Sequence, residues 1–331
     1  MWWSSMHGDT PTTTRHGWTG KAPVSVVVPT RNEERNLREC LLSVVPWAGE
    51  VFVLDSYSDD RTVAIAEEMG ARVAQRHFDS FSAQKNWALD RLPFRHDWVF
   101  FLDADERATP PLRDEICSRM ADPAGLCDGY YMGRKNYFMG QWVRHGGWYP
   151  NWQLRLFKHR LGRYEDRIVH EHVILEGRVG YLKTPLLHQD YKGLERYFDR
   201  HNVYSSMEAI EAYRLFHPPS KGHLKPSLFT RGPGRRRFLK EAAYRYLPAR
   251  PLFKFLWMYL GQGGILDGRI GFRYCVLQSF YEYQVSLKLL EMRTDPTSPL
   301  QVKYGRPHPA EGGTGERMGR QEAARHAWKR P

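Results

Sequence analysis

The 331-residue sequence is poor in cysteine and in long apolar runs, and both shortages narrow the class of protein. Its four cysteines form no CxxC pair, which argues against a disulfide scaffold or a cysteine-based zinc site and suits a reducing compartment. No apolar run reaches the ~18–20 residues that a membrane-spanning helix needs, and the N-terminus lacks the apolar core of a secretory signal. We therefore expect a cytoplasmic protein that does not cross a membrane.

Acidic residues are scarce relative to basic ones. The chain has 49 Lys and Arg against 37 Asp and Glu, a formal net charge of +12, which favours an anionic partner such as nucleotide phosphates, nucleic acid or an acidic membrane surface. A hydrophobic content of 41% excludes wholesale disorder. The two ends differ from the rest, because residues 1–22 show no periodicity and residues 294–331 are dense in Pro, Gly and charge. We predict a disordered leader and a disordered tail there.

Strand and helix patterns alternate over the first hundred residues after the leader. Runs typical of buried strands fall at 24–28, 51–54, 71–75 and 98–102, and helical patterns begin near residues 32, 59, 82 and 109. This alternation predicts an α/β fold with a mostly parallel central sheet that binds its ligand at the carboxyl ends of the strands. After Asp128, short aromatic-rich strands at 129–139, 152–157, 168–175 and 179–187 predict a mixed extension of the sheet. Helices follow at 194–216 and 274–292.

Carboxylates stand where two of these strands end. Asp55 follows one strand, and Asp103 and Asp105 follow another in the sequence Leu102-Asp-Ala-Asp-Glu106. Two Asp residues at i and i+2 can share a hard divalent cation, which would also bind a diphosphate. A lone DxD is common by chance and often forms only a polar turn, so its meaning depends on the surrounding motifs.

Those motifs occur in a specific order. Val24-Ser-Val-Val-Val-Pro-Thr-Arg-Asn-Glu-Glu34 comes first, followed by Asp55-Ser-Tyr-Ser-Asp-Asp-Arg-Thr62, Gln84-Lys-Asn86 and Asp103-Ala-Asp-Glu106. With these blocks the chain resembles the family 2 glycosyltransferases of the GT-A (nucleotide-diphospho-sugar transferase) fold. It is most similar to the bacterial lipopolysaccharide-core β-1,4-glucosyltransferase group, which further blocks at 136–138, 144–150, 153–157, 169–171 and 187–188 also match. The resemblance covers roughly residues 22 to 290.

The resemblance implies a donor site for a nucleotide sugar. Residues that correspond to the family's nucleotide-contacting positions are Pro29, Asn32, Glu33, Asp55, Lys85 and Asp103. The DxD then supplies the ligands of a divalent metal, Mg²⁺ or Mn²⁺, with Asp105 the more direct ligand and Asp103 closer to the ribose or a metal-bound water. His188 matches the late histidine that completes the metal shell in many such folds, although a lone histidine after a strand is often only structural.

The resemblance also indicates acceptor-side residues and a general base. An inverting transfer needs a carboxylate that deprotonates the acceptor hydroxyl. Glu171 occupies the place where the family supplies it, and Asp166 is the alternative. Arg144 and Trp148 are expected to face the acceptor, where Trp148 offers a flat surface for a sugar ring or, alternatively, a packed side chain at a tight turn. Arg155, within a Leu-Arg-Leu strand, is expected to face the leaving diphosphate.

The C-terminal third is basic and aromatic. Residues 221–250 contain nine Lys and Arg and one Glu, and Pro251-Leu-Phe-Lys-Phe-Leu-Trp-Met-Tyr-Leu260 follows directly. Such a combination suits the surface of an anionic leaflet, whereas the alternative is a solvated loop beside a segment packed on the catalytic domain. We predict four parts, which are the leader (1–22), a GT-A catalytic domain (23–190), a helical and basic extension that associates with a membrane (191–293) and the tail (294–331).

These features together predict a metal-dependent, inverting glycosyltransferase of cell-envelope, lipopolysaccharide-type biosynthesis. It would transfer a sugar, glucose in the first instance, from a UDP-sugar donor to a hydroxyl of a glycolipid or saccharide acceptor. We expect it on the cytoplasmic face of the inner membrane. A polyprenyl-phosphate glycosyltransferase is the nearest alternative, since it would differ only in the acceptor pocket. A nucleic-acid-binding protein is the alternative from another class, but no recognition motif supports it, and we expect no nucleic-acid partner.

Overall fold

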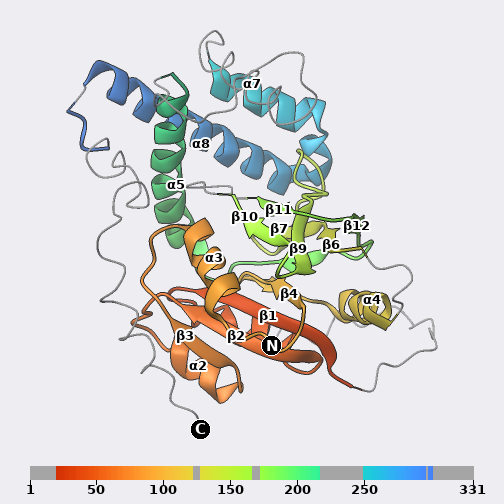
Figure 1. The fold of residues 1–331 in the computed structure, drawn as a ribbon. Coiled ribbons are helices and arrows are strands. Elements are labelled where there is room, and N and C mark those ends of the chain that lie inside the picture. The colour runs from red at the N-terminus through yellow and green to blue at the C-terminus, as the bar shows by residue number, and fades with distance from the viewer. Residues whose placement is uncertain (1–19, 122–126, 166–171, 217–248, 296, 301–331) are drawn as a thin grey trace. The chain divides into compact units, whose positions relative to one another are not determined.

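The structure, a computed structural model, describes residues 20–121, 127–165, 172–216, 249–295 and 297–300 (Figure 1). Most of the predicted leader and tail lies outside these residues, so both stay predictions. The chain separates into two compact units, residues 1–199 with 252–279 and residues 200–251 with 280–331. The predicted division into a catalytic domain at 23–190 and an extension at 191–293 also stays a prediction.

A seven-stranded mixed sheet forms the centre of the first unit, with the strand order β12-β6-β9-β4-β1-β2-β3. Its strands are β1 (Ala22–Thr30), β2 (Ala48–Asp55), β3 (Arg72–Gln75), β4 (Trp98–Phe101), β6 (Gly129–Met132), β9 (Gln153–Lys158) and β12 (Val179–Tyr181). The pairs β1–β2, β1–β4, β2–β3 and β6–β12 are parallel, and β9 runs antiparallel to both β4 and β6. The predicted mostly parallel sheet with a mixed extension is confirmed.

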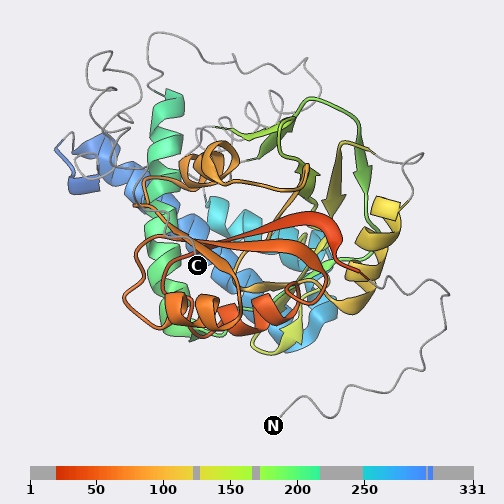
Figure 2. The same cartoon turned by 60° about the horizontal axis from the view of Figure 1, so that its bottom comes forward.

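Helices cover both faces of this sheet (Figure 2). They are α1 (Leu37–Leu42), α2 (Thr62–Glu68), α3 (Phe81–Arg91) and α4 (Pro110–Ala121). Alternate residues of a strand point to opposite faces, so Val26 and Val28 pack with α1, α2 and α4, whereas Val27 packs with α3. Because both faces are covered, β1 is apolar on both sides, which explains the consecutive valines at 26–28.

A smaller sheet stands beside the carboxyl ends of the central strands. It has the order β5-β13-β7-β8, with β5 (Glu106–Arg107), β7 (Arg134–Phe138), β8 (Gln141–Trp142) and β13 (Leu186–His188), and β10 (Gly162–Tyr164) pairs separately with β11 (Val173–Leu175). The predicted strands 129–139 and 179–187 are each divided between the two sheets. The small sheet places His188 opposite Glu106.

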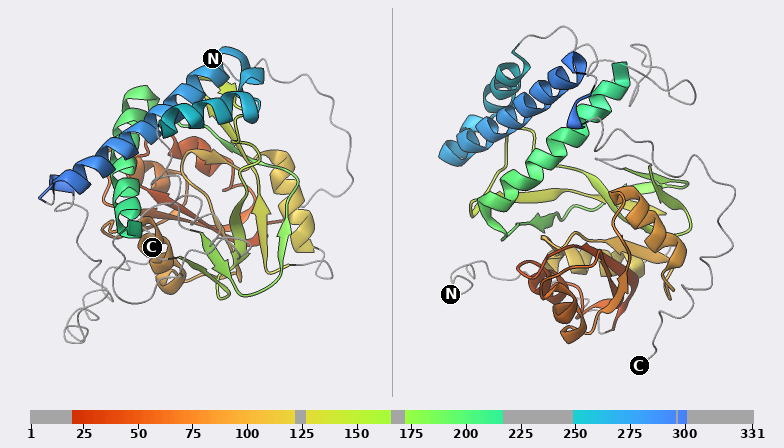
Figure 3. Two further views of the ribbon diagram at one scale, coloured as in Figure 1. Left: turned by 90° about the horizontal axis from the view of Figure 1, so that it is seen from above. Right: turned by 90° about the vertical axis from the view of Figure 1, so that its left-hand side faces the viewer.

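The C-terminal elements are helical, as predicted, and divide between the two units. They are α5 (Gly193–Phe216), α7 (Arg250–Leu256), the π-helical turn η2 (Trp257–Gly261), the 3₁₀ turn η3 (Gly264–Asp267) and α8 (Gly268–Thr294). Within the first unit, α7 and η2 fold back along the start of α8, where the Phe255 and Phe272 rings lie 5.8 Å apart (Figures 1 and 3). The second unit has its own core, in which Ala209 and Ile210 pack against Val285 and Leu289. Among the described residues, no helix has the length and apolarity that a bilayer span requires.

Candidate active site

The loops after β1 and β2 are tied to each other at the carboxyl edge of the sheet. Asn32 has a positive φ of 55°, which brings its backbone N–H 2.8 Å from Ser58 Oγ while its side-chain oxygen accepts from Asp59 N at 3.1 Å. Asn is among the residues that tolerate this left-handed conformation best. Pro29 stands within β1, in register with Leu54. Asn32 therefore belongs to a fixed pair of loops and Pro29 to the strand that leads into it, and their contact with a nucleotide stays a prediction.

The carboxylate of Asp55 is fully buried at the end of β2 and accepts four hydrogen bonds. One oxygen accepts from the Thr30 and Ser58 hydroxyls, and the other accepts from Ser58 N at 2.9 Å and Gln75 Nε2 at 3.1 Å. These four bonds use the capacity of an ionised carboxylate. Asp55 thus fixes the loop that follows it, and its predicted contact with a nucleotide stays a prediction.

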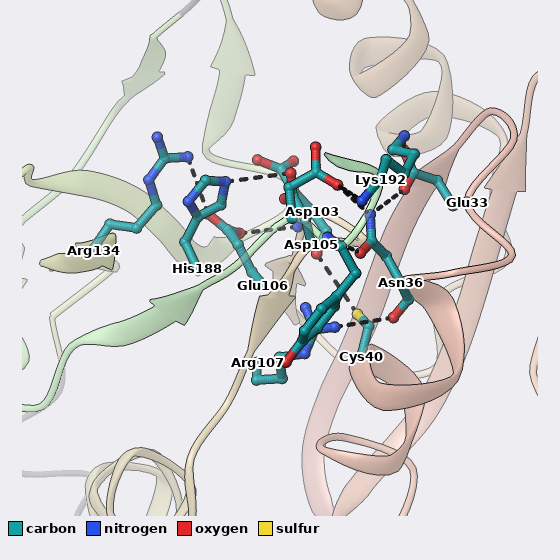
Figure 4. A network of polar contacts seen from close by, with 12 residues as sticks. Glu33, Asn36, Cys40, Asp103, Asp105, Glu106, Arg107, Arg134, His188 and Lys192 are labelled. Atoms are coloured by element: carbon teal, nitrogen blue, oxygen red, sulfur yellow. Dashed lines mark hydrogen bonds and ion pairs between the residues drawn. The ribbon is translucent and has the colours of Figure 1, made fainter. Parts of the chain in front are cut away.

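Asp103 faces a buried guanidinium. Arg155, on β9, donates to both oxygens of Asp103, at 3.3 Å from Nη1 and 2.5 Å from Nη2, and Nη2 also lies 3.0 Å from Glu106 Oε1. Arg134 reaches the same Glu106 oxygen at 3.4 Å, and the other Glu106 oxygen accepts from Asp103 N at 3.0 Å. Figure 4 shows Asp103, Glu106 and Arg134 together. The predicted diphosphate contact of Arg155 stays a prediction, because its guanidinium holds two carboxylates here.

These charges stabilise one another. Burial alone would raise the pKa of Asp103, but the positive charges of Arg155 and Lys85 outweigh it and lower that pKa to about 2. Burial would likewise lower the pKa of Arg155, yet Asp103 and Glu106 hold it well above its ordinary value. Lys85, predicted to face the nucleotide, is only 6% exposed, and its Nζ lies 5.0 Å from the centre of the Tyr164 ring. Asp103 is therefore ionised, and its two hydrogen bonds from Arg155 fix the orientation of its carboxylate.

The second aspartate of the DxD has a different partner. Asp105 Oδ2 lies 3.3 Å from His188 Nε2, and Gln189 N donates to the Asp105 carbonyl at 2.9 Å (Figure 4). His188 comes from β13, so the small sheet brings it to the DxD across 83 residues of chain. His188 Nδ1 is buried and has no hydrogen-bond partner in the described part of the chain. Asp105 and His188, both predicted metal ligands, are thus side by side.

An aspartate and a histidine suit a divalent cation that takes its remaining ligands from water and a substrate diphosphate. Among the residues the structure describes, no three His, Cys, Asp or Glu side chains are grouped to hold an ion. Of the three predicted metal ligands, Asp105 and His188 therefore lie together, whereas Asp103 is hydrogen-bonded to Arg155. The pair fits Mg²⁺ or Mn²⁺ with two protein ligands.

A further network borders this pair and contains Glu33, whose predicted contact with a nucleotide stays a prediction. Its other members, Asn36, Asp190 and Lys192, were not predicted from the sequence. Lys192 Nζ lies 2.5 Å from Glu33 Oε1, and the Asn36 amide donates to Glu33 at 2.9 Å and to Asp190 at 2.9 Å (Figure 4). Burial and the nearby negative charge of Asp105 raise the pKa of Glu33, whereas Lys192 lowers it, with a net rise. No spacing signal could reveal Lys192, because it pairs with an acid 159 positions earlier. The network joins the loop after β1 to the segment after β13.

The predicted acceptor-side residues lie on one loop between β8 and β9. The Arg144 guanidinium stands 4.3 Å from the centre of the Trp142 ring, and Trp148 packs edge-on against Tyr274 with ring centres 4.4 Å apart. The packing of Trp148 agrees with the alternative of a tight turn, and its contact with an acceptor stays a prediction. Glu171 and Asp166, the two candidates for the general base, lie outside the described residues.

Comparison with known proteins agrees with this geometry. Residues 25–174 match the family model described as glycosyl transferase family 2. This segment contains most of β1, the strands β2 to β10 and both aspartates of the DxD. It is similar to family 2 glycosyltransferase domains, and with the observed sheet this match confirms the prediction of a GT-A fold.

Curated relatives share shorter stretches. An uncharacterized glycosyltransferase from Rickettsia bellii is 38% identical over 93 residues, which cover 28% of this chain and 31% of that protein. A TPR repeat-containing protein from Synechococcus elongatus is 31% identical over 209 residues, 60% of this chain and 49% of that protein. The chain thus spans a third to a half of the length of these relatives. Among solved structures, Staphylococcus aureus TarS 1-349 in complex with UDP-GlcNAc aligns with a TM-score of 0.43 at 13% identity, over 82% of this chain and 91% of that one.

Proposed function

We propose that the protein is a metal-dependent, inverting glycosyltransferase that moves glucose from UDP-glucose to a hydroxyl of a glycolipid or lipopolysaccharide-core saccharide. The observation that carries the proposal is the Asp105–His188 pair beside Asp103 at the carboxyl edge of the sheet. Both aspartates lie in the segment that matches glycosyl transferase family 2, and His188 follows that segment. Ligands of open α/β sheets bind at this edge.

The donor side needs groups that bind an anionic diphosphate. Asp105 and His188 would hold Mg²⁺ or Mn²⁺, which when bound offsets the negative charge that develops on the leaving UDP. Arg155 keeps Asp103 ionised and holds its carboxylate in place, and Glu106 anchors Arg155 in turn. In this proposal, Asp103 then faces the donor. Glu33 and Lys192 border the same edge and hold the loop that corresponds to the family's nucleotide-contacting loop.

The acceptor hydroxyl needs a base on the face opposite the leaving group. The sequence resemblance assigns this role to Glu171, with Asp166 as the alternative, and an ionised carboxylate within hydrogen-bond reach would accept the hydroxyl proton. Glu171→Gln is expected to reduce transfer far more than Asp166→Asn while both variants still bind the donor. Equal activity of Glu171→Gln and wild type would remove Glu171 from the reaction.

A glycolipid acceptor would place the protein at a membrane. The net charge of +12 and the basic stretch 221–250 support an anionic surface as a partner. The proposed location is the cytoplasmic face of the inner membrane, with the protein bound peripherally. Transfer to a lipid phosphate rather than to a sugar hydroxyl would instead identify a polyprenyl-phosphate glycosyltransferase.

The variant Asp105→Ala tests the role of the DxD. Because it removes one of two adjacent ligand groups, UDP release from the donor is expected to fall by about 100-fold or more. The thermal midpoint and far-UV circular dichroism should stay near those of the wild type. Asp90→Ala, which changes an exposed aspartate on α3, is the matched control and should retain activity. Full activity of Asp105→Ala with an unchanged metal response would exclude the DxD from the mechanism.

A further inference from the structure

The helical segment Leu252–Ser279, here called the apolar hairpin, exposes an unusually apolar surface. Along α7 and η2, the side chains of Leu252, Phe253, Leu256, Trp257 and Leu260 are 41–62% exposed. Their spacing places them on one face of a helix, since residues four apart lie above one another. This outward face is apolar over more than two turns, where a helix on the surface of a water-soluble domain normally carries polar residues.

The inward face of the same hairpin is apolar as well. Met258, Tyr274 and Cys275 are nearly fully buried in a cluster with Val143, so the hairpin is already packed on its domain. The residues of the outward face therefore take no part in packing the core. At the tip of the hairpin, the turn adds Ile265 at 49% and Leu266 at 71% exposed. Exposed apolar patches of this extent mark an interaction site.

The charges around the patch favour one occupant. Lys254 is the only charged residue from Pro251 to Gly263, and Arg269 and Arg273 are exposed at the start of α8. Asp267, the only acid of the hairpin, is turned inward and its side chain is 5% exposed. An apolar face with a Trp, flanked by cations and free of exposed acids, matches the interface of an anionic lipid bilayer.

The hairpin also holds the loop that carries Arg144 and Trp148. Asp267 Oδ2 accepts from Arg144 N at 2.9 Å and His145 N at 2.8 Å, and its Oδ1 lies 2.7 Å from His145 Nδ1. Gly146 N donates to the Gln262 carbonyl at 2.9 Å. Three successive backbone N–H groups of the loop are thus bound by the turn at the tip of the hairpin.

The loop lies directly against the hairpin. Gly147 has a positive φ of 79°, a conformation that other residues rarely adopt, and it faces the Gln262 side chain. Trp148 completes the contact through the buried Tyr274 ring. The exposed Ile265 and Leu266 lie between the loop anchors Gln262 and Asp267, so one short turn carries both an exposed apolar surface and the hydrogen bonds to the loop.

We infer that the apolar hairpin inserts its exposed face into an anionic bilayer and that Asp267 is a positioning residue that couples this docking to the loop 144–148. The inference rests on the proposed function only in assigning that loop to the acceptor. Docking would fix the loop at the membrane surface, where the headgroup of an embedded glycolipid lies.

Vesicle sedimentation of the full chain tests the docking surface without any catalysis. Wild type is expected to bind vesicles of phosphatidylglycerol and phosphatidylethanolamine and to bind pure phosphatidylcholine more weakly. The double variant Trp257→Glu, Leu266→Glu should lose about tenfold or more in partitioning. Leu42→Glu is the matched control, because Leu42 is 50% exposed on α1, and it should bind as the wild type does. Equal binding by the double variant and the control, or no binding by wild type, would overturn the inference.

Hydrogen exchange tests the coupling. In wild type, the amides of 144–146 should exchange more slowly when anionic vesicles are added. Asp267→Ala removes the acceptor of two amides, so these should exchange about tenfold or more faster and lose their response to vesicles. Asp267→Asn keeps an acceptor oxygen and should restore much of the protection. Vesicle binding that leaves the exchange of 144–146 unchanged would overturn the coupling.

A second copy of the chain is the competing occupant. If light scattering shows a dimer that the double variant makes monomeric, and wild type ignores vesicles, the surface is a protein interface and the inference is wrong. Both experiments read binding and exchange rather than sugar transfer. A failure of the proposed function, seen as absent donor turnover with intact vesicle binding, is therefore distinguishable from a failure of this inference.

Discussion

Two aspartates two residues apart serve different purposes in this protein. Asp103 faces the buried Arg155, whereas Asp105 faces His188. From the sequence, both aspartates are predicted to bind a metal or a ribose, because the DxD motif occurs among the other motifs of the family. It does not predict this separation, since Arg155 and His188 reach the motif from strands that lie 52 and 83 residues further along.

Arg155 is the residue whose loss should cost most stability. Its side chain is 6% exposed and it neutralises both Asp103 and the fully buried Glu106. Arg155→Ala would remove the cation that pairs with Asp103 and would leave the fully buried Glu106 with only its longer contact to Arg134. We therefore expect a loss of about 3–5 kcal/mol in the free energy of unfolding. Denaturant titration measures it.

The matched control for that prediction is Arg163→Ala. Arg163 also pairs with an aspartate, Asp90, but both side chains are about half exposed. Exposed pairs contribute about 0–1 kcal/mol, so this variant should stay close to wild type. Similar small losses for the two arginine variants would contradict the role of Arg155 as the charge that holds the site.

At the scale of elements, the sequence predicts the first half of the fold better than the second. The strand at 24–28 and the helix that begins near Ser82 are found as β1 and α3, because apolar periodicity directly reports which face is buried. The predicted strand 129–139 is instead divided into β6 and β7. Only Gly133 separates them, and a break of one residue is too short for the sequence pattern to reveal that the chain changes sheets.

One side chain joins three strands of the extension. Asp128, just before β6, accepts from Lys158 Nζ at 2.8 Å at the end of β9 and from Arg178 N at 2.9 Å at the start of β12. The hydrogen bond from Lys158, followed by that from Arg178 N, lowers the pKa of Asp128 below its ordinary value of 3.8. The ionised form is therefore favoured in the folded protein.

This lowered pKa predicts a pH dependence with a definite sign. The unfolded chain takes up a proton more readily than the folded protein, so the stability that Asp128 contributes is present at neutral pH and is lost as the pH falls below about 3.8. We expect Asp128→Asn to lose about 1 kcal/mol at pH 7. Unfolding curves should show the gap to wild type closing toward acid pH. A gap that stays constant or widens on acidification would contradict the assignment.

At the scale of the whole molecule, composition and motif order define the class of protein, whereas the substrates depend on shape. The net charge of +12 predicts an anionic partner, and the described residues place cationic groups both beside the loop after β1, as with Lys192, and on the apolar hairpin, as with Arg269. Neither the charge nor the motifs specify the acceptor, because a pocket is formed by segments that meet only in the fold. For the hairpin, the sequence favours a membrane surface and leaves packing on the domain as the alternative, since its apolar residues suit a core as well.

The most direct test of the account is UDP release by the purified protein across a panel of sugar nucleotides, with Mn²⁺, with Mg²⁺ and with EDTA. The account predicts turnover of UDP-glucose, which EDTA abolishes and either cation restores. Turnover that EDTA leaves unchanged would contradict the metal role of Asp105 and His188. No release from any donor, together with no thermal stabilisation by any sugar nucleotide, would contradict the assignment as a glycosyltransferase.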